Sequence, residues 1–255
     1  MKIVILGGEG KMTSMLCNRL QKEFIIEKII IEKKVPKLVL LKKRIKKLGL
    51  WTVLGQVCFV VFIIPFLEKK SAKRKKAIMD FYHLDESNDF KNNDNCVHVD
   101  SVNGDTCYNL LKSINPDIVI VNGTRIISKK IIQCVPSPFI NMHTGITPKY
   151  RGCYGDYWAF YNQDDENAGV TIHFIDEGID TGNIIYQGII KRTPEDNCAT
   201  YSYLQMGVGV ELEIKAIKEQ LKGSIKRQTN DLPSKIWSHP TIWQYIYGYI
   251  KFKAK

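Results

Sequence analysis

Residues 141–152 read Asn-Met-His-Thr-Gly-Ile-Thr-Pro-Lys-Tyr-Arg-Gly, residues 169–173 read Gly-Val-Thr-Ile-His, and residues 176–182 read Asp-Glu-Gly-Ile-Asp-Thr-Gly. Asn141 and His143 stand two positions apart at the end of an apolar run, so they share one face of an expected strand. A second expected strand, 170–175, leads into a glycine-rich loop that carries Asp180. An amide that binds an oxyanion, an imidazole that moves a proton and a carboxylate that orients the imidazole suit acyl transfer.

The order of these three pieces resembles the N10-formyltetrahydrofolate-dependent formyltransferases. That family includes glycinamide ribonucleotide transformylase, methionyl-tRNA formyltransferase and the sugar N-formyltransferases. Its pattern is Asn-x-His, then a Pro-x-x-Arg-Gly loop, then Asp-x-x-x-Asp-x-Gly, and the present chain matches all three. The resemblance is close over 115–190 and loose over 1–32. It implies an N-formyltransferase that takes its formyl group from N10-formyltetrahydrofolate.

The resemblance also implies roles for three catalytic residues. Asn141 would donate its side-chain N–H to the developing oxyanion, and Asp180 would hold and charge the imidazole of His143. His143 would accept the proton of the attacking amine or stand as a cation beside the oxyanion. His173, in the middle of a strand, is instead expected to be a buried structural residue.

By the same resemblance, the folate lies between two loops at the ends of strands, 122–125 and 176–180. The residues expected to bind it are Asn122, Gly123, Thr124, Arg125, Asp176, Gly178 and Ile179. The residues expected to bind the acceptor substrate are Gly7, Gly8, Gly10, Lys11, Tyr150 and Arg151. The glycines follow the first strand, where they form either an anion cradle or a plain turn. Arg151 is expected to anchor its loop by an ion pair more than to clamp the substrate.

The first half of the chain alternates short apolar runs with helical patterns. Strands are expected at 3–6, 25–31, 96–99 and 117–121, and helices at 13–24 and 105–114. The alternation predicts an α/β fold, a Rossmann-like and mostly parallel sheet with helices on both faces. We expect a catalytic domain over 1–190 with a helical insertion at 33–82. A helix from 201 to about Gly223 and an aromatic tail form a C-terminal appendage over 191–255.

Seven cysteines are scattered along the chain without a Cys-x-x-Cys pair, which favours reduced thiols in the cytoplasm over disulfides, and no metal site is expected. The formal net charge is +11, and its distribution is uneven. Residues 33–76 hold fourteen Lys or Arg residues and one acidic residue, a net of +13, while the rest of the chain has a net of −2. A general nucleic-acid binder would carry its basic residues more evenly.

Within this basic segment, residues 48–67 form a run of about twenty residues without a charged side chain, long enough to span a membrane. Basic clusters flank both ends, so they give no orientation signal. We expect this run to be buried as a helical insertion, with a homodimer contact as one way to cover it, and we expect Pro65 to end or kink the helix. Peripheral contact of 33–76 with an anionic membrane is the alternative, and a true span is disfavoured.

Three functions remain open. The favoured one is formylation of a nucleotide-linked amino sugar for surface polysaccharide synthesis. Formylation of glycinamide ribonucleotide or methionyl-tRNA is the second, although about sixty residues after the catalytic block are too few for a separate tRNA-binding domain. A non-catalytic, membrane-docked folate-binding scaffold is the third. Aromatic residues at 237–253 could stack on nucleic acid, but packing on the core or on the apolar run is favoured, and no nucleic-acid partner is expected.

Overall fold

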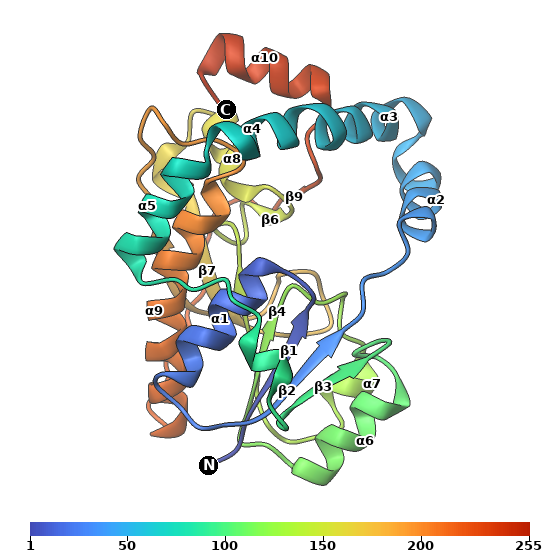
Figure 1. The fold of residues 1–255 in the computed structure, drawn as a ribbon, viewed down its shortest axis with the longest axis vertical. Helices are drawn as coiled ribbons and strands as arrows, with labels where there is room; N and C mark the ends of the chain where they lie inside the picture. The colour runs from blue at the N-terminus through green and yellow to red at the C-terminus, as the bar shows by residue number, and fades with distance from the viewer.

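The computed structural model describes residues 1–255, the whole chain. A seven-stranded sheet lies at its centre, in the order β3-β2-β1-β4-β5-β7-β8 (Figure 1). The strands are β1 (Ile3–Gly8), β2 (Ile26–Glu32), β3 (Cys96–Val99), β4 (Ile118–Asn122), β5 (Phe139–His143), β7 (Gly169–Phe174) and β8 (Ile184–Ile189). The first five are parallel, and β7 and β8 are antiparallel to their neighbours. The expected mostly parallel sheet is confirmed.

Helices cover both faces of the sheet, as expected. The alternation of side chains along β4 shows this, because Ile118 and Ile120 belong to one apolar core while Val119 and Val121 belong to another. The first core includes α1 (Lys11–Gln21) and α9 (Tyr201–Leu221), and the second includes α6 (Asp105–Ile114) and α7 (Lys129–Ile132).

The remaining elements complete the end of the molecule farthest from the N-terminus. They are helix α8 (Gly155–Tyr161), a two-stranded sheet of β6 (Arg151–Gly152) and β9 (Ile236–Trp237), and helix α10 (Ile242–Phe252). Short 3₁₀ turns η2 and η3 cover Asp89–Asn92 and Asp165–Asn167. The division at residue 190 stays a prediction, although α9 packs directly on the sheet and on α1.

The insertion between β2 and β3 is helical, as expected. It consists of α2 (Lys37–Leu48), α3 (Leu50–Cys58), a π-helical turn η1 (Phe59–Ile63), α4 (Ile64–Lys70) and α5 (Ala72–Tyr82). Pro65 does not end the helix. The π turn stands immediately before it, and such a turn absorbs the irregularity that a residue without an N–H imposes on the hydrogen-bond ladder.

The expected burial of residues 48–67 within the protomer is wrong. In the most apolar window of Leu50–Lys70, which is long enough to cross a membrane, only 28% is buried. An inner stripe that includes Val53 and Phe59 faces the core, while Trp51 and Phe62 are largely exposed. A helix that is apolar on every side cannot bury more than one side against a single protein surface.

A single membrane crossing by Leu50–Lys70 is incompatible with the sheet. β1 and β2 precede this segment and β3 and β4 follow it, yet β1 pairs with β4 residue by residue, Ile3 opposite Ile118. Since one crossing would place these strands on opposite sides of a bilayer, the segment does not cross.

The aromatic tail packs as expected on the core and on the apolar run. The ring of Trp237 stacks on Trp158 with centroids 4.7 Å apart, and Tyr245 of α10 meets Phe59 of the insertion at 5.4 Å. Helix α10 begins with a capping box, in which Thr241 and Gln244 each satisfy a backbone N–H of the other.

Candidate functional site

Asn141 and His143 lie at the carboxyl end of β5, on the sheet face turned away from α9. Their neighbours Ile140 and Met142 pack into the core that contains α9, so alternation turns the amide and the imidazole to the other face. Asp180 reaches them from the loop between β7 and β8. Its carboxylate Oδ2 lies 3.4 Å from Nδ1 of His143. The three residues predicted from the sequence are therefore brought together.

Both ring nitrogens of His143 face oxygen atoms that can only accept. The backbone carbonyl of Tyr150 lies 2.8 Å from Nε2, which therefore donates to it, and the Asp180 carboxylate faces Nδ1. Both contacts are satisfied only when both nitrogens carry a proton. The geometry favours an imidazolium beside the carboxylate, the second of the two roles considered for His143.

His173 is buried and hydrogen-bonded, as expected, and its contacts also connect it to the site. It stands directly opposite Asn141 in the antiparallel pairing of β5 with β7. Its Nδ1 donates to the carbonyl of Phe174 at 2.8 Å, so its Nε2 accepts from Nδ2 of Asn141 at 3.1 Å. Burial, with the neighbouring His143, lowers the pKa of His173 below its ordinary value, so it stays a neutral acceptor. His173 thus fixes which way the Asn141 amide points.

The loop that carries Asp180 is held from the Pro-x-x-Arg-Gly segment. The backbone N–H of Gly152 donates to Oδ2 of Asp180 at 3.0 Å, and Nε of Arg151 donates to the carbonyl of Ile179 at 2.7 Å. A second guanidinium nitrogen donates to the hydroxyl of Ser234 at 2.6 Å. Arg151 therefore anchors the loop, as expected, but through neutral oxygens and not through an ion pair. Asp180 itself adopts a left-handed conformation, φ 50°.

A cavity of about 130 Å³ opens beside Asn141, His173 and Asp180. Five of the seven residues predicted to bind the cofactor line it: Thr124, Arg125, Asp176, Gly178 and Ile179. Its apolar walls come from Val121, Ile126, Ile127 and Ile175, which the sequence analysis did not name. A slot with apolar walls and backbone groups at strand ends suits a flat heteroaromatic ring.

Two predicted cofactor residues lie outside this cavity, and a third is engaged elsewhere. The side-chain oxygen of Asn122 accepts from the Thr13 hydroxyl at 3.1 Å, and Gly123 packs under β1. Nε of Arg125 donates to the carboxylate of the buried Glu32 at 2.6 Å. Since a buried carboxylate requires a partner, the guanidinium of Arg125 compensates the charge of Glu32 at the edge of the cavity.

Of the predicted acceptor-binding residues, Tyr150 and Arg151 contact the catalytic His143 or the loop that carries Asp180. Gly7 and Gly8 belong to β1 and pair with β2, so they are not a loop, and Lys11 forms an ion pair with Glu86 at 3.0 Å. Gly10 precedes α1 and does not line the cavity. Tyr150 is fully buried, and its hydroxyl donates to Asp164 at 2.6 Å. Its contribution to the site is therefore the carbonyl that His143 binds.

Gly8 has a packing role that mutation can test. A Cβ at this position would lie 2.1 Å from the carbonyl oxygen of Gly123. We expect Gly8→Ala to lower the free energy of unfolding by roughly 1–3 kcal/mol. The added methyl group forces the backbone of β1 away from the backbone at Gly123. Urea unfolding measures this. Gly10→Ala is the matched control, since its Cβ would meet nothing within 4 Å, and equal midpoints for both variants would contradict the prediction.

A second cavity, of about 270 Å³, lies on the α9 side of the end of β5 and is lined by Thr144, the residue after His143. Two buried polar atoms among its lining residues have no partner, Oδ2 of Asp156 and the hydroxyl of Tyr201. Burial raises the pKa of Asp156 well above its ordinary value. Buried groups left without partners are typical of a site completed by a ligand or by water. Neither residue belongs to a sequence pattern that predicts a site.

Comparison with known proteins gives one family match. The sequence model described as "Formyl transferase" matches residues 60–206, more than half of the chain. The methionyl-tRNA formyltransferase of Thermodesulfovibrio yellowstonii is 41% identical over 125 residues, which are 48% of this chain and 40% of that protein. That of Desulfotalea psychrophila is 34% identical over 122 residues, 48% of this chain and 38% of that protein. The matches thus span about 40% of the length of these curated relatives.

Solved structures share the fold at low sequence identity. An N-formyltransferase from Helicobacter canadensis, in complex with folinic acid and dTDP-3-aminofucose, has a TM-score of 0.58 at 19% identity, covering 93% of this chain and 71% of that one. A phosphoribosylglycinamide formyltransferase from Streptococcus pneumoniae has a TM-score of 0.55 at 16% identity, covering 87% and 99%. These likenesses confirm the α/β fold.

Proposed function

The chain belongs to the formyl transferase family, and from this premise we propose that it transfers the formyl group of N10-formyltetrahydrofolate to the amine of a nucleotide-linked amino sugar. The observation that carries the proposal is the constellation of Asn141, His143 and Asp180 at the end of β5. A scaffold that only bound folate would not need an amide, an imidazolium and a carboxylate gathered at the end of one strand.

The bound folate supplies a formyl amide whose carbon is open to attack by a neutral amine. One N–H of Asn141 is held by His173, so the other is free to donate to the formyl oxygen as negative charge develops there. The imidazolium of His143, held by Asp180 and Tyr150, adds a positive charge near that oxygen. As the new C–N bond forms and the old one breaks, the amine loses a proton and the departing folate nitrogen takes one up, while His143 stays protonated beside the formyl oxygen.

The cavity beside Asn141 is the proposed folate site, and its composition supports this. Apolar side chains of Ile127 and Ile175 offer faces for a flat ring, and the 176–180 loop offers backbone groups at its edge. The known structure from Helicobacter canadensis contains folinic acid, which supports a folate in a fold of this kind.

The second cavity, lined by Thr144, Asp156 and Tyr201, is the proposed acceptor side. It flanks the end of β5 opposite the folate cavity, and hydroxyl and carboxyl groups without partners suit the hydroxyls and the amine of a sugar. The structural relative that holds dTDP-3-aminofucose supports this acceptor class. The curated relatives favour a second candidate acceptor, methionyl-tRNA.

The experiment that tests the proposal is a mass-spectrometric screen for formylated products. The protein and N10-formyltetrahydrofolate are incubated with nucleotide-linked amino sugars, glycinamide ribonucleotide or methionyl-tRNA. We expect one amino sugar to gain a formyl group with the wild type and with His98→Ala, an exposed-histidine control, but not with His143→Ala. Formylation of methionyl-tRNA alone would overturn the sugar proposal. Tight folate binding without any product would favour the scaffold.

His173 gives a sharper test of the site, because it acts through Asn141. We expect His173→Leu to lower kcat by roughly tenfold or more with little change in KM for the folate, since the amide loses its fixed orientation. His173→Gln, which keeps an acceptor, is expected to retain more of kcat. A purely structural role would instead lower the stability of both variants and leave kcat of the folded fraction unchanged.

The proposal places the protein in a reducing cytoplasm, at the membrane surface, and its scattered cysteines support the reducing setting. A role in surface polysaccharide synthesis is part of the same proposal, as is the absence of a nucleic-acid partner. A homodimer stays a prediction.

A further inference from the structure

Two helical segments expose an apolar surface that the formyl-transfer chemistry does not use. One is the continuous helix Leu50–Lys70, formed by α3, η1 and α4, and the other is α10. The two lie together at the end of the molecule opposite the N-terminus, and we name their outer faces the platform (Figure 1). The exposed apolar side chains of the platform are Leu50, Trp51, Leu54, Val57, Val60, Val61, Phe62, Phe66, Trp243, Ile246, Tyr247, Tyr249 and Ile250.

The inner faces of the platform helices hold each other and the core in place. A Cβ at Gly55 would lie 2.7 Å from the indole nitrogen of Trp243, so the two helices touch at this glycine. The amide of Gln56 donates to the carbonyl of His239 at 2.9 Å, just before α10. Phe59 is fully buried against Tyr245. The outer apolar side chains are therefore presented by a fixed surface and not by a loose tail.

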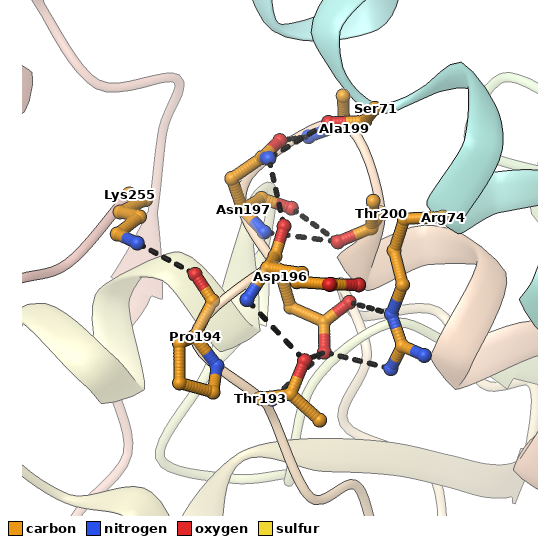
Figure 2. A network of polar contacts seen from close by, with 10 residues as sticks. Ser71, Arg74, Thr193, Pro194, Asp196, Asn197, Ala199, Thr200 and Lys255 are labelled. Carbon is orange, nitrogen blue, oxygen red and sulfur yellow. Dashed lines mark hydrogen bonds and ion pairs between the residues drawn. The ribbon is translucent and has the colours of Figure 1, made fainter.

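The platform is also tied to the sheet through α5. Figure 2 shows that Nε and Nη2 of Arg74, on α5, each donate to the carboxylate of Asp196 at 2.9 Å. Asp196 lies in the segment that leads into α9. Beside this pair, the amide of Asn197 donates to the hydroxyl of Ser71 at 2.8 Å. Both Asp196 and Asn197 are buried. Because α9 packs on the sheet that carries the site, the platform has a fixed position relative to the site.

Positive charge surrounds the apolar surface. Helix α2 carries six basic residues and no acidic one, and Lys69, Lys70 and Lys73 follow the other end of the apolar helix. From residue 37 to residue 76, only Arg74, Lys75 and Lys76 have carboxylate partners. A second copy of the chain would bring the same unpaired cations to this face, so charge complementarity favours an anionic partner.

A cavity of about 660 Å³ lies where the platform meets α5. It combines the cations Lys70, Lys73, Arg74 and Lys255 with apolar and aromatic side chains such as Phe66 and Tyr249, and contains one carboxylate, Glu195. Cations beside aromatic rings at the edge of an apolar surface match the headgroup level of a bilayer, where phosphate lies next to hydrocarbon.

We propose that the platform docks on a bilayer that contains anionic phospholipid, with the apolar faces of Leu50–Lys70 and α10 in the interface and the cavity around Lys70 and Lys73 at the level of the lipid phosphates. The helix lies in the interface because the sheet pairing excludes a crossing. The exposed Trp51, Trp243 and Tyr249 stand where interfacial aromatics are favoured. This inference does not depend on the identity of the acceptor.

Flotation of the full chain with vesicles tests the proposal. We compare vesicles of phosphatidylcholine with vesicles that also contain roughly one third phosphatidylglycerol. We expect binding to the anionic vesicles, roughly tenfold or more weaker binding to the neutral ones, and weakening by added salt. Bromine-labelled acyl chains are expected to quench Trp fluorescence, and the quenching is expected to fall in Trp51→Tyr with Trp243→Tyr.

Negative charges introduced into the platform distinguish insertion of its apolar side chains into the bilayer from electrostatic attraction to the bilayer surface. Phe62→Glu with Ile250→Glu is expected to abolish flotation, whereas Ile25→Glu, an equally exposed apolar position beside β2 and away from the platform, is expected to leave it unchanged. Unchanged thermal unfolding would show that the variants are folded. No flotation of the wild type, or equal flotation of all variants, would overturn the proposal. So would a dimer in solution that Phe62→Glu dissociates without any vesicle binding.

Discussion

Replacing Asn141 by alanine is expected to lower kcat/KM for formyl transfer by roughly 10²–10³-fold, with most of the loss in kcat. The structure leaves one N–H of this amide free, because the other is given to His173 at 3.1 Å. The free N–H is the donor aimed where charge develops on the formyl oxygen, so its removal costs mainly in the transition state. Asn141→Asp is expected to be worse, since a carboxylate there would repel the developing charge.

The measurement is steady-state kinetics on the acceptor found in the screen, with folate affinity determined separately. Asn167→Ala is a suitable control, because its amide donates to Asp164 in the turn before β7. A fall of the same size in both variants would point to a loss of folded protein. An unchanged kcat in Asn141→Ala would remove the amide from the mechanism.

Glu213→Gln is expected to stabilise the protein at pH 8 by roughly 3–5 kcal/mol and to change stability little at pH 4.5. Glu213 lies fully buried in α9, neither carboxylate oxygen has a partner, and burial raises its pKa to about 8. Below pH 4.5 the group is protonated in both the folded and the unfolded chain. Between pH 4.5 and about 8 only the unfolded chain releases the proton, so stability falls by roughly 1.4 kcal/mol for each pH unit.

Chemical unfolding of both forms at pH 4.5 and pH 8 measures the difference. Gln keeps the shape of the protonated acid, so the effect isolates the charge. The control is Glu211→Gln on the same helix, whose exposed carboxylate binds Arg19 and whose loss should cost about 1 kcal/mol or less. A wild type and a Glu213→Gln variant with the same pH dependence would show that Glu213 is not the group that titrates.

The catalytic three and the mostly parallel sheet could be predicted because their signals are local. Asn141 and His143 are two residues apart on one strand, and the strands around them are continuous apolar runs. The role of His173 could not be found in this way, because it depends on an antiparallel pairing that brings together residues 32 positions apart. The contact between Asn141 and His173 follows from the strand register, which the sequence alone does not show.

Other predictions were wrong because a sequence pattern does not show which partner a side chain or backbone group contacts. Tyr150 stands in a loop full of donors, yet its hydroxyl binds Asp164, a partner that only the folded loop defines. The run 48–67 has no polar face, so its pattern cannot distinguish burial in protein from exposure. Gly7 and Gly8 resembled a loop because glycine weakens any strand signal, but their backbones complete the pairing with β2.

Helix α2 has twelve residues and none of them is buried. The side chain of Arg44 connects α2 to the segment before α10, because its Nη2 lies 3.1 Å from Nδ1 of His239. A helix of this length is marginal in water on its own, and the mutual repulsion of its six Lys and Arg side chains disfavours it further. Helix α2 can therefore unfold at a small cost in free energy. An anionic surface that neutralised its cations would stabilise the folded helix. In that case part of the binding energy is spent on folding α2, so the affinity of the protein for a bilayer would understate the strength of the contacts it makes.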